Sequence, residues 1–215
     1  MCNFFFLIYS AHAQFDFNNC KTCSKTIKEK LSKTSLWLGQ VSSFSFPDHR
    51  LTIDFGVSLF EKNNFLPNIS NSLKLTRNLT FISKIYSFNH GKQSPHIYGL
   101  GVLYVSKNNE GSNWISSLQK VNLRGLSDYR LSTITIGVSK AMSYKTVNIS
   151  YVLGSTFYDQ KFYKFYENIS KKIESQINFT HFSGLTKIKG LQFETKVSGN
   201  FKTIIFSCSI KKGII

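Results

Sequence analysis

Few residues in this chain have types and spacings that could do chemistry. Cys20 and Cys23 have the Cys-x-x-Cys spacing of a disulfide loop, a redox pair or half of a metal site. No second pair and no nearby histidine completes a zinc set, and no histidine follows Cys23, which excludes haem attachment. We expect a small disulfide loop in an oxidising compartment, with two inert thiols as the alternative. No metal and no cofactor is expected.

The histidines provide no recognisable catalytic set. His49, His90, His96 and His181 have no acidic residue at a characteristic spacing, and the chain has no Gly-x-Ser-x-Gly, His-Glu-x-x-His or phosphate-binding loop. We therefore expect a protein that is not an enzyme. A barrel enzyme acting on lipid, with a Ser/His/acid set assembled only by folding, is the least favoured alternative.

Aromatic and basic residues are crowded together between Ser155 and Lys172, which we predict to be the longest interruption between strands. Such a loop could stack on sugars or bases. We favour a simpler interpretation, in which these residues are strand extensions and interfacial aromatics with lysines reaching toward water. The loop is still the best candidate for external contact; its residues are Phe157, Tyr158, Lys161, Phe162, Tyr163, Lys164, Phe165 and Tyr166.

The elements that must position all these residues are β-strands. In the stretch Asp128–Ser155, Ile134, Ile136 and Val138 alternate with small or hydroxyl-bearing residues, and the pattern continues after a polar turn. A period of two places alternate side chains on opposite faces of a strand. The same alternation recurs along most of the chain, and the three prolines fall between strands or at the first residue of one.

The order of these segments predicts an all-β fold, an antiparallel up-and-down β-barrel of about ten strands. The first predicted strand is Leu36–Phe46, and its pairing with the last, Phe201–Ile210, would close the barrel. We expect three parts: residues 1–13 as a signal peptide, 14–35 as a polar lead with one short helix or no fixed structure, and 36–215 as a single barrel domain. Thr26-x-x-Glu29 is a candidate capping box for that helix.

The export signal rests on a short apolar run, Phe4–Tyr9, followed by small residues. Ala11-x-Ala13 fits a signal-peptidase site with cleavage before Gln14. A buried first strand of a cytoplasmic protein is the alternative. Export would place the chain in the periplasm, outside the cell or in the outer membrane.

Composition and charge limit the kinds of molecule that this protein is expected to bind. Of the 215 residues, 15% are aromatic and only 18% are charged, and the formal net charge is +16. Because the lysines are scattered over turns and strand ends rather than gathered on one element, nucleic acid is not expected as a partner. We expect contact with membrane lipid, including anionic headgroups or lipopolysaccharide. No oligomeric state is predicted.

Long alternating strands with short connections resemble the bacterial outer-membrane β-barrel proteins, over roughly Leu36 to Ile215. That resemblance implies a non-enzymatic pore, transporter or structural component in the outer membrane of a Gram-negative-type bacterium, with aliphatic residues toward lipid. It implies a polar interior, for which the alternation selects Asp54, Thr133, Thr135, Asn148, Glu174, Gln176, Asn178, Gln192, Glu194 and Lys196. A soluble, exported β-sandwich or barrel that binds a ligand is the alternative, since the same alternation suits a sheet whose apolar face turns inward.

Overall fold

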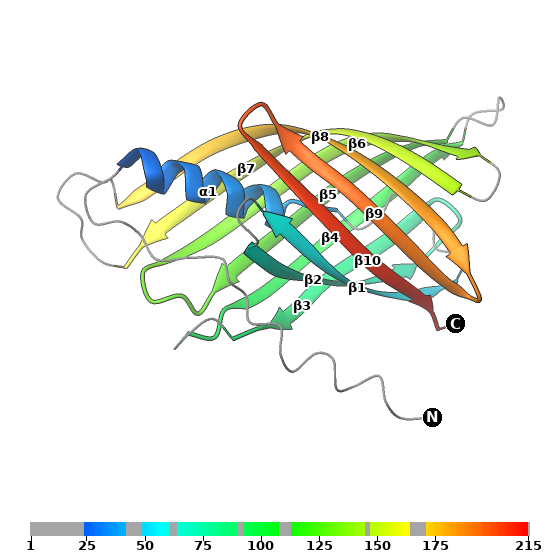
Figure 1. Ribbon diagram of the computed structural model, residues 1–215, viewed down its shortest axis with the longest axis horizontal. Helices are drawn as coiled ribbons and strands as arrows, with labels where there is room; N and C mark the ends of the chain where they lie inside the picture. Colours follow the sequence, from blue (N-terminus) through cyan, green and yellow to red (C-terminus); the bar gives the residue numbers. More distant parts are fainter. Residues whose placement is uncertain are drawn as a thin grey trace.

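A closed antiparallel β-barrel with one helix inside it makes up the described part of the chain (Figure 1). The computed structural model describes residues 24–41, 49–60, 64–89, 93–107, 113–144, 147–163 and 171–214. Within these ranges lie helix α1 (Ser24–Leu38) and the strands β1 (Leu51–Phe60), β2 (Asn64–Lys74), β3 (Leu79–Ser87), β4 (His96–Lys107), β5 (Asn113–Arg124), β6 (Tyr129–Tyr144), β7 (Val147–Phe162), β8 (Lys172–Ile188), β9 (Leu191–Asn200) and β10 (Thr203–Gly213).

The topology is the predicted up-and-down meander. Each strand pairs with the next one along the chain, and β1 pairs with β10, with Val57 opposite Cys208. The predicted barrel of about ten strands is therefore confirmed, and a two-sheet sandwich is excluded. The predicted closure was wrong, because Leu36–Leu38 belongs to α1 and the closing strand is β1; residues 42–48 lie outside the described part.

The two ends of the barrel differ. The terminal end is where β1 begins and β10 finishes. The helix end is where β5 and β7 finish, and α1 lies beside the end of β7 and the start of β8 there (Figure 1). The longest connections between strands, residues 88–95 and 163–171, are also at the helix end.

The outer wall is apolar over most of its area. Aliphatic and aromatic side chains point outward, as the resemblance implies, and many are more than a third exposed, among them Phe55, Leu100, Ile136, Leu153, Phe193 and Phe206. A water-soluble protein buries such residues, because each fully exposed aliphatic side chain forgoes roughly 1.5–3 kcal/mol of burial free energy. Exposure on this scale is typical of a wall that faces hydrocarbon.

On β5 to β8 the polarity of the two faces reverses toward the helix end. On β6, Ile134, Ile136 and Val138 point outward in the middle of the strand, but Arg130 points outward near its start, while Leu131 and Tyr129 are buried inside. The same exchange occurs on β8, where Ile177 and Phe179 are buried. In these four strands the apolar side chains therefore point outward over part of the strand and inward nearer the helix end.

Candidate functional site

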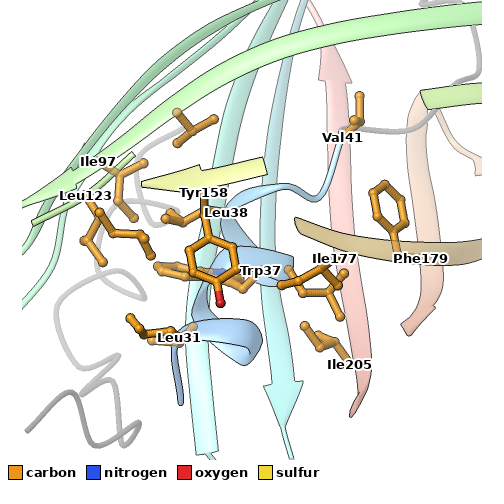
Figure 2. Close-up of a cluster of buried hydrophobic side chains, with 14 of the residues drawn as sticks. Leu31, Trp37, Leu38, Val41, Ile97, Leu123, Tyr158, Ile177, Phe179 and Ile205 are labelled. Atoms are coloured by element: carbon orange, nitrogen blue, oxygen red, sulfur yellow. The ribbon is translucent and has the colours of Figure 1, made fainter. Parts of the chain in front are cut away.

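Helix α1 fills the helix end of the lumen. Ile27 and Leu31 lie one turn apart on its buried face, and Leu36, Trp37 and Leu38 are almost completely buried at its last turn. Figure 2 shows Trp37 surrounded by wall residues that include Tyr158 and Ile177. The Trp37 ring also meets Phe88 edge-on, with ring centroids 6.1 Å apart. The helix thus builds an apolar core inside the barrel, and this core is the reason that β5–β8 carry apolar residues on their inner face there.

The helix has the local features of a stable short helix. Glu29 and Lys33 form an i,i+4 ion pair of 3.0 Å. The helix begins at Ser24, so Thr26 is already inside it and the predicted capping box does not mark its start. It ends at Leu38, before Gly39.

The backbone at Gly39 lies so close to the barrel wall that a side chain at this position would not fit. A Cβ atom at this position would lie 2.5 Å from Thr156 Oγ1 and 2.8 Å from Thr135 Oγ1. These two hydroxyls are 2.9 Å apart and bond to each other across β6 and β7. The glycine therefore lets the backbone that follows α1 press directly against the barrel wall.

Wall side chains bind the carbonyl groups that the end of the helix leaves unpaired. Lys84 Nζ donates to the Leu38 carbonyl oxygen at 3.2 Å and also to that of Gln40. Gln119 Nε2 donates to the Gly39 carbonyl at 2.7 Å, and Lys196 Nζ to that of Val41 at 3.2 Å. Cations at the carboxyl end of a helix are favoured because the last carbonyls carry partial negative charge.

The side chain of Gln40 extends this attachment to strands β1, β2 and β10. Its amide nitrogen donates to Ser207 Oγ at 3.0 Å, and its amide oxygen accepts from Ser58 Oγ at 3.0 Å and from Asn68 Nδ2 at 3.1 Å. Residues 38–41 are thus tied to strands on several sides of the barrel. We call the segment 24–41 the plug.

Beyond the plug, toward the terminal end, the lumen contains buried charges. Glu194 lies 3.2 Å from Lys196 Nζ and 2.9 Å from Lys211 Nζ, and Asp54 lies 3.7 Å from Lys211 Nζ. All four residues are less than a tenth exposed. Buried ions persist only when they are paired and hydrogen-bonded, so this network holds β1, β9 and β10 together around the closing seam.

Several residues predicted for the interior do point inward. Asp54, Thr133, Thr135, Glu194 and Lys196 are buried there, and Thr133 Oγ1 donates to the Val121 carbonyl at 3.2 Å. Gln192 is half-buried on the same face of β9 as Glu194. Asn148 is exposed near the start of β7 and shares its face with the buried Ser150.

Glu174, Gln176 and Asn178 were misplaced by the prediction. They lie exposed on the outer face of β8, whose inner face carries Ile177 and Phe179 at this level. Packing against the plug makes the inner face apolar here, so the rule that polar residues point inward fails. Gln176 and Asn178 bond to each other and to Ser155 on that outer face.

Half of the residues of the predicted aromatic and basic loop belong to a strand. Phe157, Tyr158, Lys161 and Phe162 belong to β7, with Tyr158 and Phe162 buried inside and Phe157 and Lys161 exposed outside. Strand β7 continues because its inner residues pack in the core around the plug. Tyr163 follows the strand and is exposed. Lys164, Phe165 and Tyr166 lie outside the described residues, as do Ala11, Ala13, Gln14, Cys20 and Cys23.

One histidine takes part in the interior. His181 Nδ1 and Ser198 Oγ are 3.0 Å apart, and both residues are 1% exposed. His49 and His96 lie at opposite ends of the barrel, near the starts of β1 and β4, while His90 lies outside the described residues. Over the described ranges, no group of three or more His, Cys, Asp or Glu side chains could hold a metal ion.

Sequence reasoning missed the residues that attach the plug. Lys84, Gln119 and Gln40 stand in no recognisable motif. The partners of Lys84 and Gln119 are main-chain carbonyls far away in sequence, and those of Gln40 are side chains of distant strands. The available signal was the helical spacing of Ile27 and Leu31, which indicates a helix but not that the helix lies within the barrel.

An apolar outer wall around a polar, plugged interior defines the chain as a β-barrel of the outer-membrane type. The α1 helix of the described chain is too short and too polar to cross a bilayer. No protein-family model matches the sequence, and no curated protein matches it.

Three of the solved structures to which the chain is similar differ from it greatly in sequence. The KdgM porin is 9% identical, with a TM-score of 0.46 over 76% of this chain and 99% of its own. The Acinetobacter baumannii outer membrane protein Omp33 is 7% identical, with a TM-score of 0.39 over 77% of this chain and 98% of its own. The translocator domain of the autotransporter NalP from Neisseria meningitidis is 7% identical, with a TM-score of 0.43 over 86% of this chain and 93% of its own.

Proposed function

We propose that this protein is a non-enzymatic outer-membrane pore whose lumen is closed by its own N-terminal segment. The observation that carries the proposal is the position of the plug: Trp37 and its neighbours fill the helix end of the lumen. Residues 1–13 would direct export, and a Cys20–Cys23 disulfide loop would precede the plug. The outer wall would contact membrane lipid, including anionic headgroups.

The distribution of polarity inside the barrel favours a gated pore over a purely structural barrel. At the terminal end the lumen is lined by charged and hydroxyl-bearing side chains. Thr52 Oγ1, Thr80 Oγ1 and Glu194 Oε1 are buried there without a hydrogen-bond partner among the described residues. Water or a polar solute would satisfy such atoms. The plug is held by hydrogen bonds from wall side chains to its carbonyl oxygens and by apolar packing, so its release would connect the polar terminal end of the lumen to the helix end.

The alternative of a lipid-modifying enzyme rests on the Ser198–His181 pair. Its position argues for a structural role, since both side chains are buried behind the plug and away from the lipid-facing wall. A neutral imidazole that bonds to a serine hydroxyl satisfies two polar groups in the interior. We therefore assign the pair to the interior network.

The location and the pore activity are tested separately. Pelleting with membranes, resistance to carbonate extraction and heat-modifiable gel mobility are expected of an inserted barrel; recovery in the soluble periplasmic fraction would refute the location.

In planar bilayers the full-length protein should show long closed periods with rare openings. Cysteines at Gln40 and Ser207, joined by a bifunctional thiol crosslinker in a Cys208→Ser background, should abolish the openings. Openings that persist after complete crosslinking would show that the plug is not the gate.

A further inference from the structure

Four cationic residues form a row across adjacent strands on the outer wall at the helix end. Arg130 of β6 is directly opposite Lys161 of β7, which is directly opposite Lys172 of β8. Arg124 of β5 extends the row, one residue beyond the pair Leu123–Leu131. Residues directly opposite on an antiparallel pair have Cβ atoms about 4.5–5.5 Å apart, so these cations are close neighbours.

Such a row is unfavourable without an anion, because like charges directly opposite each other destabilise a sheet. Two carboxylates, Asp159 and Glu174, lie two residues nearer to the membrane band on the same outer face. Both form ion pairs with Lys172. The ion pairs of these two carboxylates within 4 Å are with Lys172, while Lys161 interacts with Glu174 only over a longer distance. Arg124 stacks over the Tyr98 ring, with its guanidinium carbon 5.6 Å from the ring centroid.

The surface beside the row is hollowed and leads onto the apolar wall. A hollow of about 190 Å³ is lined by Arg124, Arg130 and Lys161 together with Asn122, Ser132 and Asp159. A second hollow of about 520 Å³ shares Ser132 and Asp159 with the first and is lined by Glu174 and Gln176 as well as by Ile134 and Phe157, which are both more than a third exposed. The depression therefore joins a cationic end to a part that combines exposed apolar side chains with the carboxylates that pair with Lys172.

This order of charge and apolar surface matches an amphiphile with a phosphate headgroup. The row coincides with the level at which the faces of β5–β8 exchange polarity, which is where the wall leaves the hydrocarbon. Outer-membrane barrels carry their longer loops on the extracellular side, and the longer connections here are at the helix end. An arginine guanidinium binds phosphate oxygens in a bidentate manner, and a lysine contributes a point charge.

We infer that Arg124, Arg130 and Lys161 form a binding site for the phosphate of an anionic lipid in the outer leaflet, with the acyl chains on the wall around Ile134 and Phe157. The inference deepens the proposed membrane contact and rests on the chain being a membrane barrel; it does not depend on whether the plug gates a pore. Bound phosphate would remove the repulsion within the row and fix the depth of the barrel.

Native mass spectrometry of the detergent-solubilised full-length barrel tests the site, with diphosphoryl lipid A as the probe and phosphatidylcholine as the zwitterionic comparison. The wild-type barrel should retain lipid A in preference to phosphatidylcholine. The double variant Arg130→Gln/Lys161→Gln should lose about tenfold or more of this retention, because each charge-assisted contact is individually strong. The charge-preserving variant Arg130→Lys/Lys161→Arg should keep most of it.

The matched control is Lys140→Gln/Lys212→Gln, which removes two cations from the outer wall at the opposite end. It should bind lipid A as the wild type does. Equal retention by the wild type and by Arg130→Gln/Lys161→Gln would overturn the site, as would an equal loss in the control. Heat-modifiable mobility of each variant reports a folded membrane barrel, so a failure of the proposed fold in the membrane is distinguished from a failure of the lipid site.

Discussion

Lys84, from the wall of the barrel, donates a hydrogen bond to the carbonyl of Leu38, the last residue of the helix inside it. This contact joins two segments 46 residues apart in sequence. It provides a buried cation with a partner and caps the carboxyl end of α1 in one interaction.

Replacing this lysine tests the attachment of the plug. Lys84→Met should loosen the plug, because the carbonyls of Leu38 and Gln40 would lose a charged donor at roughly 1–3 kcal/mol. That change would raise the ratio of open to closed time in planar bilayers by about one to two orders of magnitude. Lys140→Met, on the outer wall, is the control and should leave gating unchanged; a Lys84→Met channel that stays as closed as the wild type would contradict the prediction.

Gly39 tests the close approach of the plug to the wall. A valine at this position would collide with the hydroxyls of Thr156 and Thr135, the nearest of which would lie 2.5 Å from the Cβ atom. Gly39→Val should therefore displace the end of the helix and increase both conductance and the accessibility of Trp37 to an aqueous fluorescence quencher. Gly184→Ala serves for comparison, since the nearest atom to its Cβ is 3.8 Å away, and it should behave as the wild type does. If the quenching of Trp37 in Gly39→Val were the same as in the wild type, close packing of the plug against the wall would be contradicted.

The buried charges near the closing seam should be important for stability. Glu194→Gln leaves Lys196 and Lys211 short of a counter-ion, and breaking a buried pair in this way costs roughly 3–5 kcal/mol. Urea unfolding in detergent, followed by loss of heat-modifiable mobility, should show a much lower midpoint. Glu174→Gln removes an exposed partner of Lys172 and should cost at most about 1 kcal/mol. Similar midpoints for the two variants would indicate that the interior network is not stabilising.

The depth of the membrane band can be mapped on one strand. Arg130 and Lys140 are ten residues apart on β6, which is roughly 33 Å of strand at about 3.3 Å per residue. At a tilt of about 40°, that length spans roughly 25 Å along the membrane normal, the usual height of the apolar band. Ile136→Arg should then cost roughly 2–4 kcal/mol of folding into lipid bilayers, and Ser132→Arg about 0–1 kcal/mol. Equal costs would show that Ile136 does not lie near the middle of the bilayer.

The two residue sets on β8 show where sequence reasoning succeeded and where it failed. The alternation correctly indicated that Glu174, Gln176 and Asn178 share a face opposite Ile177 and Phe179. It assigned that polar face to the interior because the rest of the barrel is arranged in that way. Lys84 and Gln119 could not be predicted as plug contacts, since a hydrogen bond to a main-chain carbonyl does not depend on the identity of the accepting residue. The side-chain partners of Gln40 lie on strands far away in sequence, and only folding brings them together.

The sequence by itself determined that the chain forms an antiparallel meander of alternating strands and, for most of them, which side chains share a face, because a period of two is a local property of an extended backbone. It also determined that residues around Ile27 and Leu31 favour a helix. Only the tertiary structure decided that β1 closes on β10 and that the helix lies inside. Alternation shows that two faces differ without showing what each face meets, and here the plug supplies an apolar interior at one end where water or polar groups were expected.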